Sequence, residues 1–157
     1  MLRDPRSESY AIPSIGYDCL HDHYSAADMK WSEAAMRDSF FMSNMSPQNP
    51  RFNRGIWRKL EEWVRDQALA NEEVYVVTGP VLTDGPYEEI GPNGVDVPKQ
   101  YYKVVLDYKV PELKAIGFIL PNQSSSLSLS TYAVPVDQVE GEKEVQERGR
   151  DNAEQPG

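Results

Sequence analysis

The chain has 157 residues and a formal net charge of −9, with 39% hydrophobic and 26% charged residues. This length suffices for one domain with a substantial hydrophobic core. No apolar run approaches the roughly 18 residues that a membrane-spanning helix needs, and residues 1–10 lack the apolar stretch of a signal peptide, so we expect a soluble domain. The single cysteine, Cys19, excludes an internal disulfide and leaves the cellular compartment open.

The charge is unevenly distributed along the chain. An acidic balance argues against a nucleic-acid partner when it is taken for the chain as a whole. Residues 29–66, however, carry seven basic and five acidic side chains, a local charge of +2. Residues 137–157 carry three basic and seven acidic ones, a local charge of −4. A locally basic segment within an acidic protein is compatible with phosphate binding.

The first third of the chain offers few strong structural signals. Residues 1–15 are polar and interrupted by prolines, which predicts a loop. Ser32 is a suitable helix N-cap and is followed by several helix-forming residues. Phe40 and Phe41 are expected in the core, and they lead into a short apolar segment that delivers Asn44.

An amphipathic helix is predicted over residues 53–70. Trp57, Leu60 and Val64 follow the spacing of a single helix face, so we expect these three side chains to point into the core. Prolines and Gly55 lie close to the predicted start, which favours an irregular first part of the helix.

Amide side chains crowd the loop and first turn at the start of this helix, among them Asn44, Gln48 and Asn53. Free backbone N–H groups and the helix dipole favour anions there. Glu61 follows two turns after Asn53, and Arg65 lies one turn beyond Glu61. An amide oxygen, a carboxylate and a guanidinium in this order can hold a hard cation and a phosphate together. Turn and cap roles are the ordinary alternative for amides in a loop.

The pattern N-M-S-P-Q-x(4)-N-x-G-x-W-x(2)-L-E, which begins at Asn44, resembles the metal-site segment of the DNA/RNA non-specific endonucleases. The resemblance extends over roughly residues 16–139, and includes the pieces AADMKWS, VVTGPVL, VPKQYYKVVLDY and KAIGFILPN. It implies an α+β fold of the ββα-metal (His-Me finger) type, with a mainly antiparallel sheet and the metal-site helix packed beside it.

The resemblance also implies a role for each matching residue. Asn53 would ligate Mg²⁺, for which Mn²⁺ is a substitute, and Glu61 would orient metal-bound water. Arg65 would contact phosphate. Asn44 and Gln48 would hold the site and the substrate. The implied reaction is metal-dependent, sequence-nonspecific hydrolysis of DNA and RNA phosphodiester bonds.

The general base is expected in the segment that stands where the family has Asp-Arg-Gly-His. Asp18 and His21 match its first and last positions, whereas Cys19 and Leu20 replace the arginine and the glycine. A neutral imidazole suits proton abstraction near pH 7, so His21 is the predicted base. The spacing to the next family match is one residue too long, so His23 stays an alternative.

Two other interpretations of these imidazoles are open. Both rings could be solvated loop side chains without chemistry. A small transition-metal site formed by His21, His23 and Asp22 is the third interpretation, because imidazole is a good ligand for Zn²⁺ or Cu²⁺.

The second half of the chain predicts a central sheet and its surface connections. Three β-branched and aromatic runs predict core strands at residues 74–78, 101–108 and 114–120, the first of them buried and ended by Gly79. The other expected features are a loop with a short turn at 84–98, a serine-rich surface loop at 124–130, an edge segment at 132–136 and a helix starting at 137–140.

We therefore expect an N-terminal loop over residues 1–15, a nuclease-like domain over residues 16–140 that is incomplete on its N-terminal side, and a disordered acidic tail over residues 141–157. The expected partners are DNA and RNA, without a membrane. A homodimer is one assembly that this allows, and similar bacterial proteins are often exported. The alternative function is that of a catalytically impaired family remnant that binds nucleic acid, metal or another protein.

Overall fold

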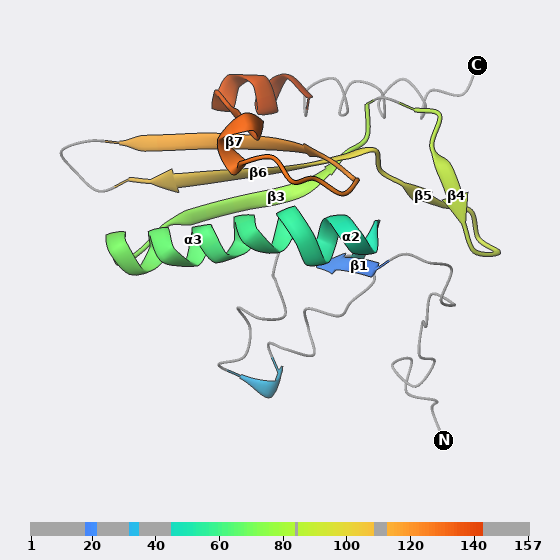
Figure 1. The fold of residues 1–157 in the computed structure, drawn as a ribbon, viewed down its shortest axis with the longest axis horizontal. Coiled ribbons are helices and arrows are strands. Elements are labelled where there is room, and N and C mark those ends of the chain that lie inside the picture. Colours follow the sequence, from blue (N-terminus) through green and yellow to red (C-terminus); the bar gives the residue numbers. More distant parts are fainter. Residues whose placement is uncertain (1–17, 22–31, 35–44, 84, 109–112, 143–157) are drawn as a thin grey trace, which may run out of the picture.

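The computed structural model describes residues 18–21, 32–34, 45–83, 85–108 and 113–142. In that part of the chain, one long helical segment packs on a face of an antiparallel sheet (Figure 1). The sheet has four strands in the order β3-β6-β7-β8. These strands are β3 (Tyr75–Val81), β6 (Gln100–Asp107), β7 (Lys114–Pro121) and β8 (Ala133–Val134). The expected α+β architecture is confirmed.

A small two-stranded sheet comes directly before the helical segment in the chain. β1 (Asp18–His21) pairs antiparallel with β2 (Met45–Gln48), in a register that sets Asp18 opposite Gln48. The helical segment begins two residues after β2 ends. Two antiparallel strands followed by a helix form the ββα unit of the predicted fold. We expected a loop over the residues of β2, and this prediction was wrong. Pairing with β1 holds these residues in an extended conformation, although their own residue types favour a turn.

The helical segment has three parts, α2 (Pro50–Phe52), the π-helical turn η2 (Asn53–Trp57) and α3 (Arg58–Asn71). The side-chain oxygen of Asn49 caps its start by accepting the backbone N–H of Arg51 at 2.9 Å. The segment thus starts three residues before the predicted range of 53–70 and ends one residue after it. The irregular first part is confirmed, since Gly55 has the non-helical angles φ −104° and ψ −108°.

The apolar face of this segment forms the main core with the sheet. Phe52, Trp57 and Leu60 are at most 1% exposed and pack in one cluster with Tyr101 of β6. The Tyr101 ring stacks on Phe52 and meets Trp57 edge-on, each with a centroid distance of 5.8 Å. Burying one such side chain contributes about 1.5–3 kcal/mol. The predicted core positions of Trp57 and Leu60 are confirmed, and Val64 packs half-buried at the margin.

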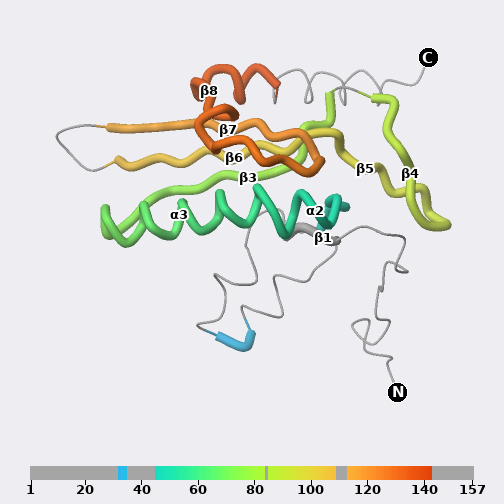
Figure 2. Tube along the Cα trace, viewed as in Figure 1, coloured from blue at the N-terminus to red at the C-terminus, as the bar shows by residue number. Residues whose placement is uncertain are grey.

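A short helix over residues 136–142 covers the other face of the sheet (Figure 2). Its Val139 is 1% exposed and packs in a second cluster with Val81 and Tyr102. The helix start expected at residues 137–140 is therefore confirmed. The described helix continues two residues past the predicted domain boundary.

Replacing Gly117 with alanine is expected to destabilise the protein by about 1–3 kcal/mol, because overpacking a core forces its neighbours to shift. A Cβ atom on Gly117 would lie 2.7 Å from Cγ2 of Val139 and 3.2 Å from the backbone oxygen of Val134. Thermal unfolding of the purified variant measures the effect. Gly141→Ala is the matched control: nothing lies within 4 Å of its Cβ position, and alanine in a helix is favoured over glycine by up to about 1 kcal/mol. Equal midpoints for the two variants would contradict the tight contact.

β3 differs from its prediction in both length and burial. It continues through Gly79 and Pro80 to Val81 instead of ending at Gly79. Because β3 lies at one edge of the sheet among the described residues, a proline there need not interrupt the hydrogen-bond ladder. The predicted burial was wrong for the first half of the strand, where Tyr75 is 51% and Val77 45% exposed. An edge strand has a neighbour on one side alone, so its apolar side chains keep more contact with solvent.

The loop expected at residues 84–98 contains a β-hairpin. β4 (Glu88–Ile90) and β5 (Val95–Val97) pair antiparallel around a four-residue turn. Gly91 and Gly94 have φ angles of 73° and 61°, a region that favours glycine. The strands were missed because three residues are too few to display an alternating pattern.

The remaining expectations have mixed outcomes. The strands predicted at 101–108 and 114–120 correspond to β6 and β7, and the edge segment at 132–136 contains β8. The serine-rich loop closes with the 3₁₀ turn η3 (Leu129–Tyr132). After Ser32, residues 33–34 are helical. The predicted N-terminal loop, Phe40, Phe41 and the tail beyond residue 142 lie outside the described residues. Within them, no helix is both long and apolar enough to cross a membrane.

Candidate active site

The amide-rich segment forms the bend between β2 and the helical segment. Gln48 ends β2 and Asn53 begins the π-helical turn η2. Glu61 lies in the first turn of α3, and Arg65 follows one turn later. Asn53, Glu61 and Arg65 are each partly buried, so each side chain keeps some contact with solvent. The ββα unit thus carries four of the predicted site residues in one continuous stretch.

The helical segment is interrupted by a kink between Asn53 and Glu61. Gly55 has non-helical backbone angles, and the N–H of Arg58 bonds to the carbonyl oxygens of Asn53 and Gly55 across the kink. In a regular α-helix, the eight residues from Asn53 to Glu61 would turn these side chains about 80° apart. Because the kink breaks this regular spacing, the two residues are related by their order along the segment and not by a shared helix face.

Hydrogen bonds from the four-stranded sheet hold the residues that precede Gln48. The Tyr101 hydroxyl donates to the carbonyl oxygen of Pro47 at 2.6 Å. It also lies 2.8 Å from the hydroxyl of Ser46, which can donate to it in turn. Since Tyr101 is fully buried in β6, β2 is fastened directly to the core.

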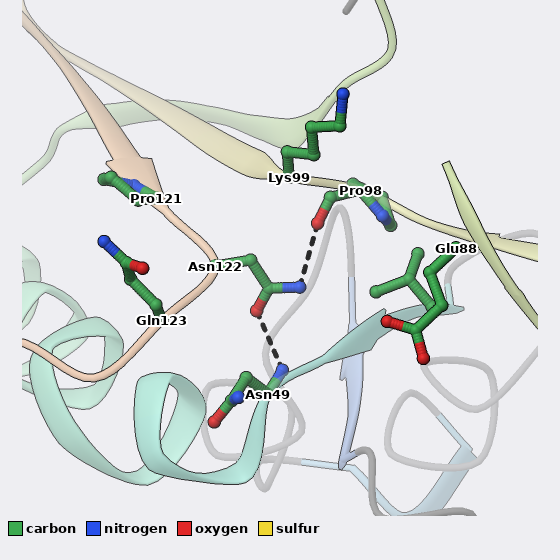
Figure 3. Close-up of a pocket in the computed structure, with 8 residues that line it drawn as sticks. Asn49, Glu88, Pro98, Lys99, Pro121, Asn122 and Gln123 are labelled. Carbon is green, nitrogen blue, oxygen red and sulfur yellow. Dashed lines mark hydrogen bonds between the residues drawn. The ribbon is translucent and has the colours of Figure 1, made fainter. Parts of the chain in front are cut away.

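Asn122, which follows β7, forms a second set of hydrogen bonds that hold the end of β2 (Figure 3). Its Oδ1 accepts the backbone N–H of Asn49 at 2.8 Å, and its Nδ2 donates to the carbonyl oxygen of Pro98 at 2.9 Å. A longer contact of 3.4 Å joins Nδ2 to the carbonyl oxygen of Pro47. Asn122 therefore links the ends of β2, β5 and β7.

Gln48 is fully buried, yet its Oε1 and Nε2 have no hydrogen-bond partner among the described residues. Leaving a buried amide unpaired costs about 1–3 kcal/mol. Such a group in a folded protein calls for a specific explanation. Gln48 immediately precedes Asn49, the cap of the helical segment.

The expected base segment lies on β1, beside this bend. The backbone of His21 is paired with Met45 and that of Asp18 with Gln48. The side chains of β1, together with Asn44 and His23, lie outside what the structure describes. The transition-metal site imagined from His21, His23 and Asp22 lies there too. In the described ranges, no group of three or more His, Cys, Asp or Glu side chains is placed to bind a metal.

Positive charge gathers at the beginning of the helical segment. Residues 50–60 carry no acidic side chain and four exposed basic ones, Arg51, Arg54, Arg58 and Lys59. Arg58 pairs with Glu62 at 3.1 Å, but both side chains are at least half exposed, so this pair contributes little to stability. Basic side chains at a helix N-terminus, where the dipole also attracts anions, favour the approach of phosphate.

An open hollow of about 370 Å³ lies beside the capped start of the segment (Figure 3). Its polar lining comes from Asn49, Glu88, Lys99, Asn122 and Gln123. The ammonium group of Lys99 lies 5.7 Å from the centre of the Tyr87 ring. Because Glu88 places a carboxylate on the same hollow, its charge is mixed.

Asn122 and Tyr101 were not predicted as site residues. Both lie in pieces of sequence that were assigned to the sheet, and an asparagine after a strand is also an ordinary turn residue. A pairing between amides 73 positions apart has no local sequence signature. The resemblance of KAIGFILPN to the family was the one available signal.

The chain is similar to known nucleases in sequence. A family model described as DNA/RNA non-specific endonuclease matches residues 23–146. Human mitochondrial endonuclease G is 33% identical over 128 residues, which are 74% of this chain and 43% of that protein. Mitochondrial nuclease 1 of Schizosaccharomyces pombe is 35% identical over 142 residues, covering 80% of this chain and 44% of that protein. The chain thus spans less than half the length of these relatives.

The similarity holds for the fold as well. A crystal structure of an EndoG/EndoGI complex matches with a TM-score of 0.74 at 33% identity, over 82% of this chain and 58% of that chain. The ββα-metal fold predicted from the sequence is thereby confirmed. The family match begins at residue 23, so the strand that carries Asp18 and His21 lies just before the matched range.

Proposed function

Since this chain belongs to the DNA/RNA non-specific endonuclease family, we propose that it is a metal-dependent nuclease that hydrolyses DNA and RNA phosphodiester bonds without sequence preference. The observation that carries the proposal is the order of Asn53, Glu61 and Arg65 along one helical segment. The helical segment follows directly on β2, which pairs with β1.

The residues at this site fit a hard divalent cation. Mg²⁺ prefers oxygen ligands and usually keeps several of its waters, so it needs few protein ligands. The amide oxygen of Asn53 and the carboxylate of Glu61 match that preference, and Mn²⁺ accepts the same oxygen ligands. When bound, the cation would neutralise charge on the scissile phosphate and the leaving oxygen.

Each residue then has one role. Asn53 would hold the cation, and Glu61 would accept hydrogen bonds from water and thereby orient it. The Arg65 guanidinium can form two parallel hydrogen bonds with a phosphate. Asn44 and Gln48 would fix the site and the substrate. His21 would remove the proton of the attacking water, for which a neutral imidazole is suited near pH 7.

The arrangement of charge supports cleavage without sequence preference. Contacts to phosphates position a protein on nucleic acid but carry no sequence information. The basic side chains gather around the start of the helical segment, where phosphate is the group they would meet. DNA and RNA share that group, so both are expected substrates.

A second candidate function is that of a family remnant that binds metal or nucleic acid without turnover. The observation that favours it is in β1, where Cys19 and Leu20 replace the family's arginine and glycine. A cysteine does not supply the charged planar donors of arginine. A leucine adds a side chain where glycine allows close approach.

Plasmid nicking by the purified protein tests the proposal. Supercoiled DNA is incubated with Mg²⁺, and parallel reactions contain EDTA or a single-stranded RNA substrate. Cleavage of both nucleic acids that EDTA abolishes is the expected result. Folded protein that binds the plasmid but leaves it intact at every Mg²⁺ concentration would instead support the remnant function.

A further inference from the structure

We infer that Asn122 is a positioning residue for Asn53, acting through Asn49 from the end of β7; its catalytic consequence rests on the function proposed above. The two residues are 69 positions apart in the sequence. They belong to different layers, since Asn122 follows a strand of the sheet and Asn53 begins the π-helical turn.

The side chain of Asn122 uses its hydrogen-bonding groups at the junction between β2 and the helical segment. Its oxygen accepts from Asn49 N–H at 2.8 Å, while its NH₂ group donates to the carbonyl oxygen of Pro98 (Figure 3). The NH₂ group also lies 3.4 Å from the carbonyl oxygen of Pro47. Its own backbone N–H donates to the carbonyl oxygen of Lys99 at 2.7 Å. An asparagine amide offers one acceptor atom and two donor hydrogens, so this amide is anchored on both sides.

Asn49 in turn binds the backbone of Asn53, the proposed metal ligand. Its carbonyl oxygen accepts the backbone N–H of Asn53 at 2.9 Å and that of Phe52 at 3.0 Å. Its peptide N–H is the group that Asn122 holds. Two hydrogen bonds thus connect the side chain of Asn122 to the backbone of Asn53, and Asn49 takes part in both of them.

The bend needs such a constraint because the local structure around it is weak. β2 has four residues, and α2 is a single turn before the kink at Gly55. A metal ligand depends on the groups that orient it, and losing one typically lowers metal affinity or activity about 10- to 100-fold. Asn122 supplies that orientation from a rigid strand end.

The test uses two variants and one matched control. Asn122→Ala removes both hydrogen-bonding functions. Asn122→Asp keeps an oxygen for Asn49 N–H but replaces the donor, and it serves if the alanine variant does not fold. The control is Thr78→Val, which removes a buried hydrogen bond of 3.0 Å to the carbonyl oxygen of Tyr102 in the same sheet.

The first readout is amide hydrogen exchange, which does not depend on activity. Exchange at Asn53 and Phe52 is expected to be at least about ten times faster in Asn122→Ala than in Thr78→Val, after correction for overall stability. In Asn122→Asp the increase should be smaller. The second readout is plasmid nicking, in which Asn122→Ala should raise the half-saturating Mg²⁺ concentration about 10-fold and Thr78→Val should leave it unchanged.

Equal exchange at Asn53 in the alanine variant and the control would overturn the inference, since Asn122 would then stabilise the fold without positioning the site. An unchanged half-saturating Mg²⁺ concentration in a folded, active Asn122→Ala protein would overturn its catalytic part. If the unmodified protein does not cut, the proposed function fails, and the exchange rates still decide whether Asn122 positions Asn53.

Discussion

Replacing Asn53 with alanine is expected to lower Mg²⁺-dependent cleavage about a thousandfold or more. The reason is that a bound cation supplies several kcal/mol of charge stabilisation in the transition state, and each 1.36 kcal/mol corresponds to a tenfold change in rate. A quantitative nicking assay at saturating Mg²⁺ measures the loss. Asn71→Ala is the matched control, because that amide donates to the carbonyl oxygen of Gln67 at the far end of the same segment.

The same variant should also lose its response to the metal in a stability measurement. A ligand at about one hundred times its Kd stabilises the folded state by about 2.7 kcal/mol, which raises the Tm of a domain of this size by several degrees. Unmodified protein and Asn71→Ala should show this rise on adding Mg²⁺, and Asn53→Ala should not. A normal rise in Asn53→Ala would show that the cation binds elsewhere, and the assignment of Asn53 would then be wrong.

Local patterns were sufficient to predict the main elements of the fold. Trp57 and Leu60 follow the period of one helix face, and both prove to be buried against the sheet. The runs that became β6 and β7 are rich in β-branched and aromatic residues, which suit central strands. In these elements, the sequence preference of each segment agrees with its surroundings, and a prediction from the sequence then succeeds.

The parts that could not be predicted depend on contacts between distant segments. β2 is extended by its pairing with β1, although its own residues favour a turn. Exposure of Tyr75 follows from the edge position of β3 in the sheet, which only the complete topology reveals. Asn122 bonds to Asn49 across 73 positions. The order of Asn53, Glu61 and Arg65 was visible in the sequence, but the hydrogen bonds that hold Asn49 just before them were not.

Replacing His21 with alanine is expected to lower cleavage about 10²- to 10⁴-fold, the usual contribution of a general base. The rise of Tm with Mg²⁺ should persist, because His21 is not proposed to hold the cation. In the unmodified protein, kcat/KM should fall as the pH is lowered below neutrality, because a protonated imidazole cannot accept the proton of the attacking water. That acidic limb should disappear from the residual activity of His21→Ala. Nicking rates between pH 5 and 9 measure both effects.

His23→Ala is the matched control, and we expect little effect from it because His21 is the predicted base. His21 is the last residue of β1 and is fixed by pairing with Met45, eight positions before Asn53. His23 lies two residues beyond that strand. Groups on strands are held accurately, and a general base must lie within hydrogen-bond reach of the proton that it removes. Loss of activity in His23→Ala with normal activity in His21→Ala would therefore show that β1 does not carry the base.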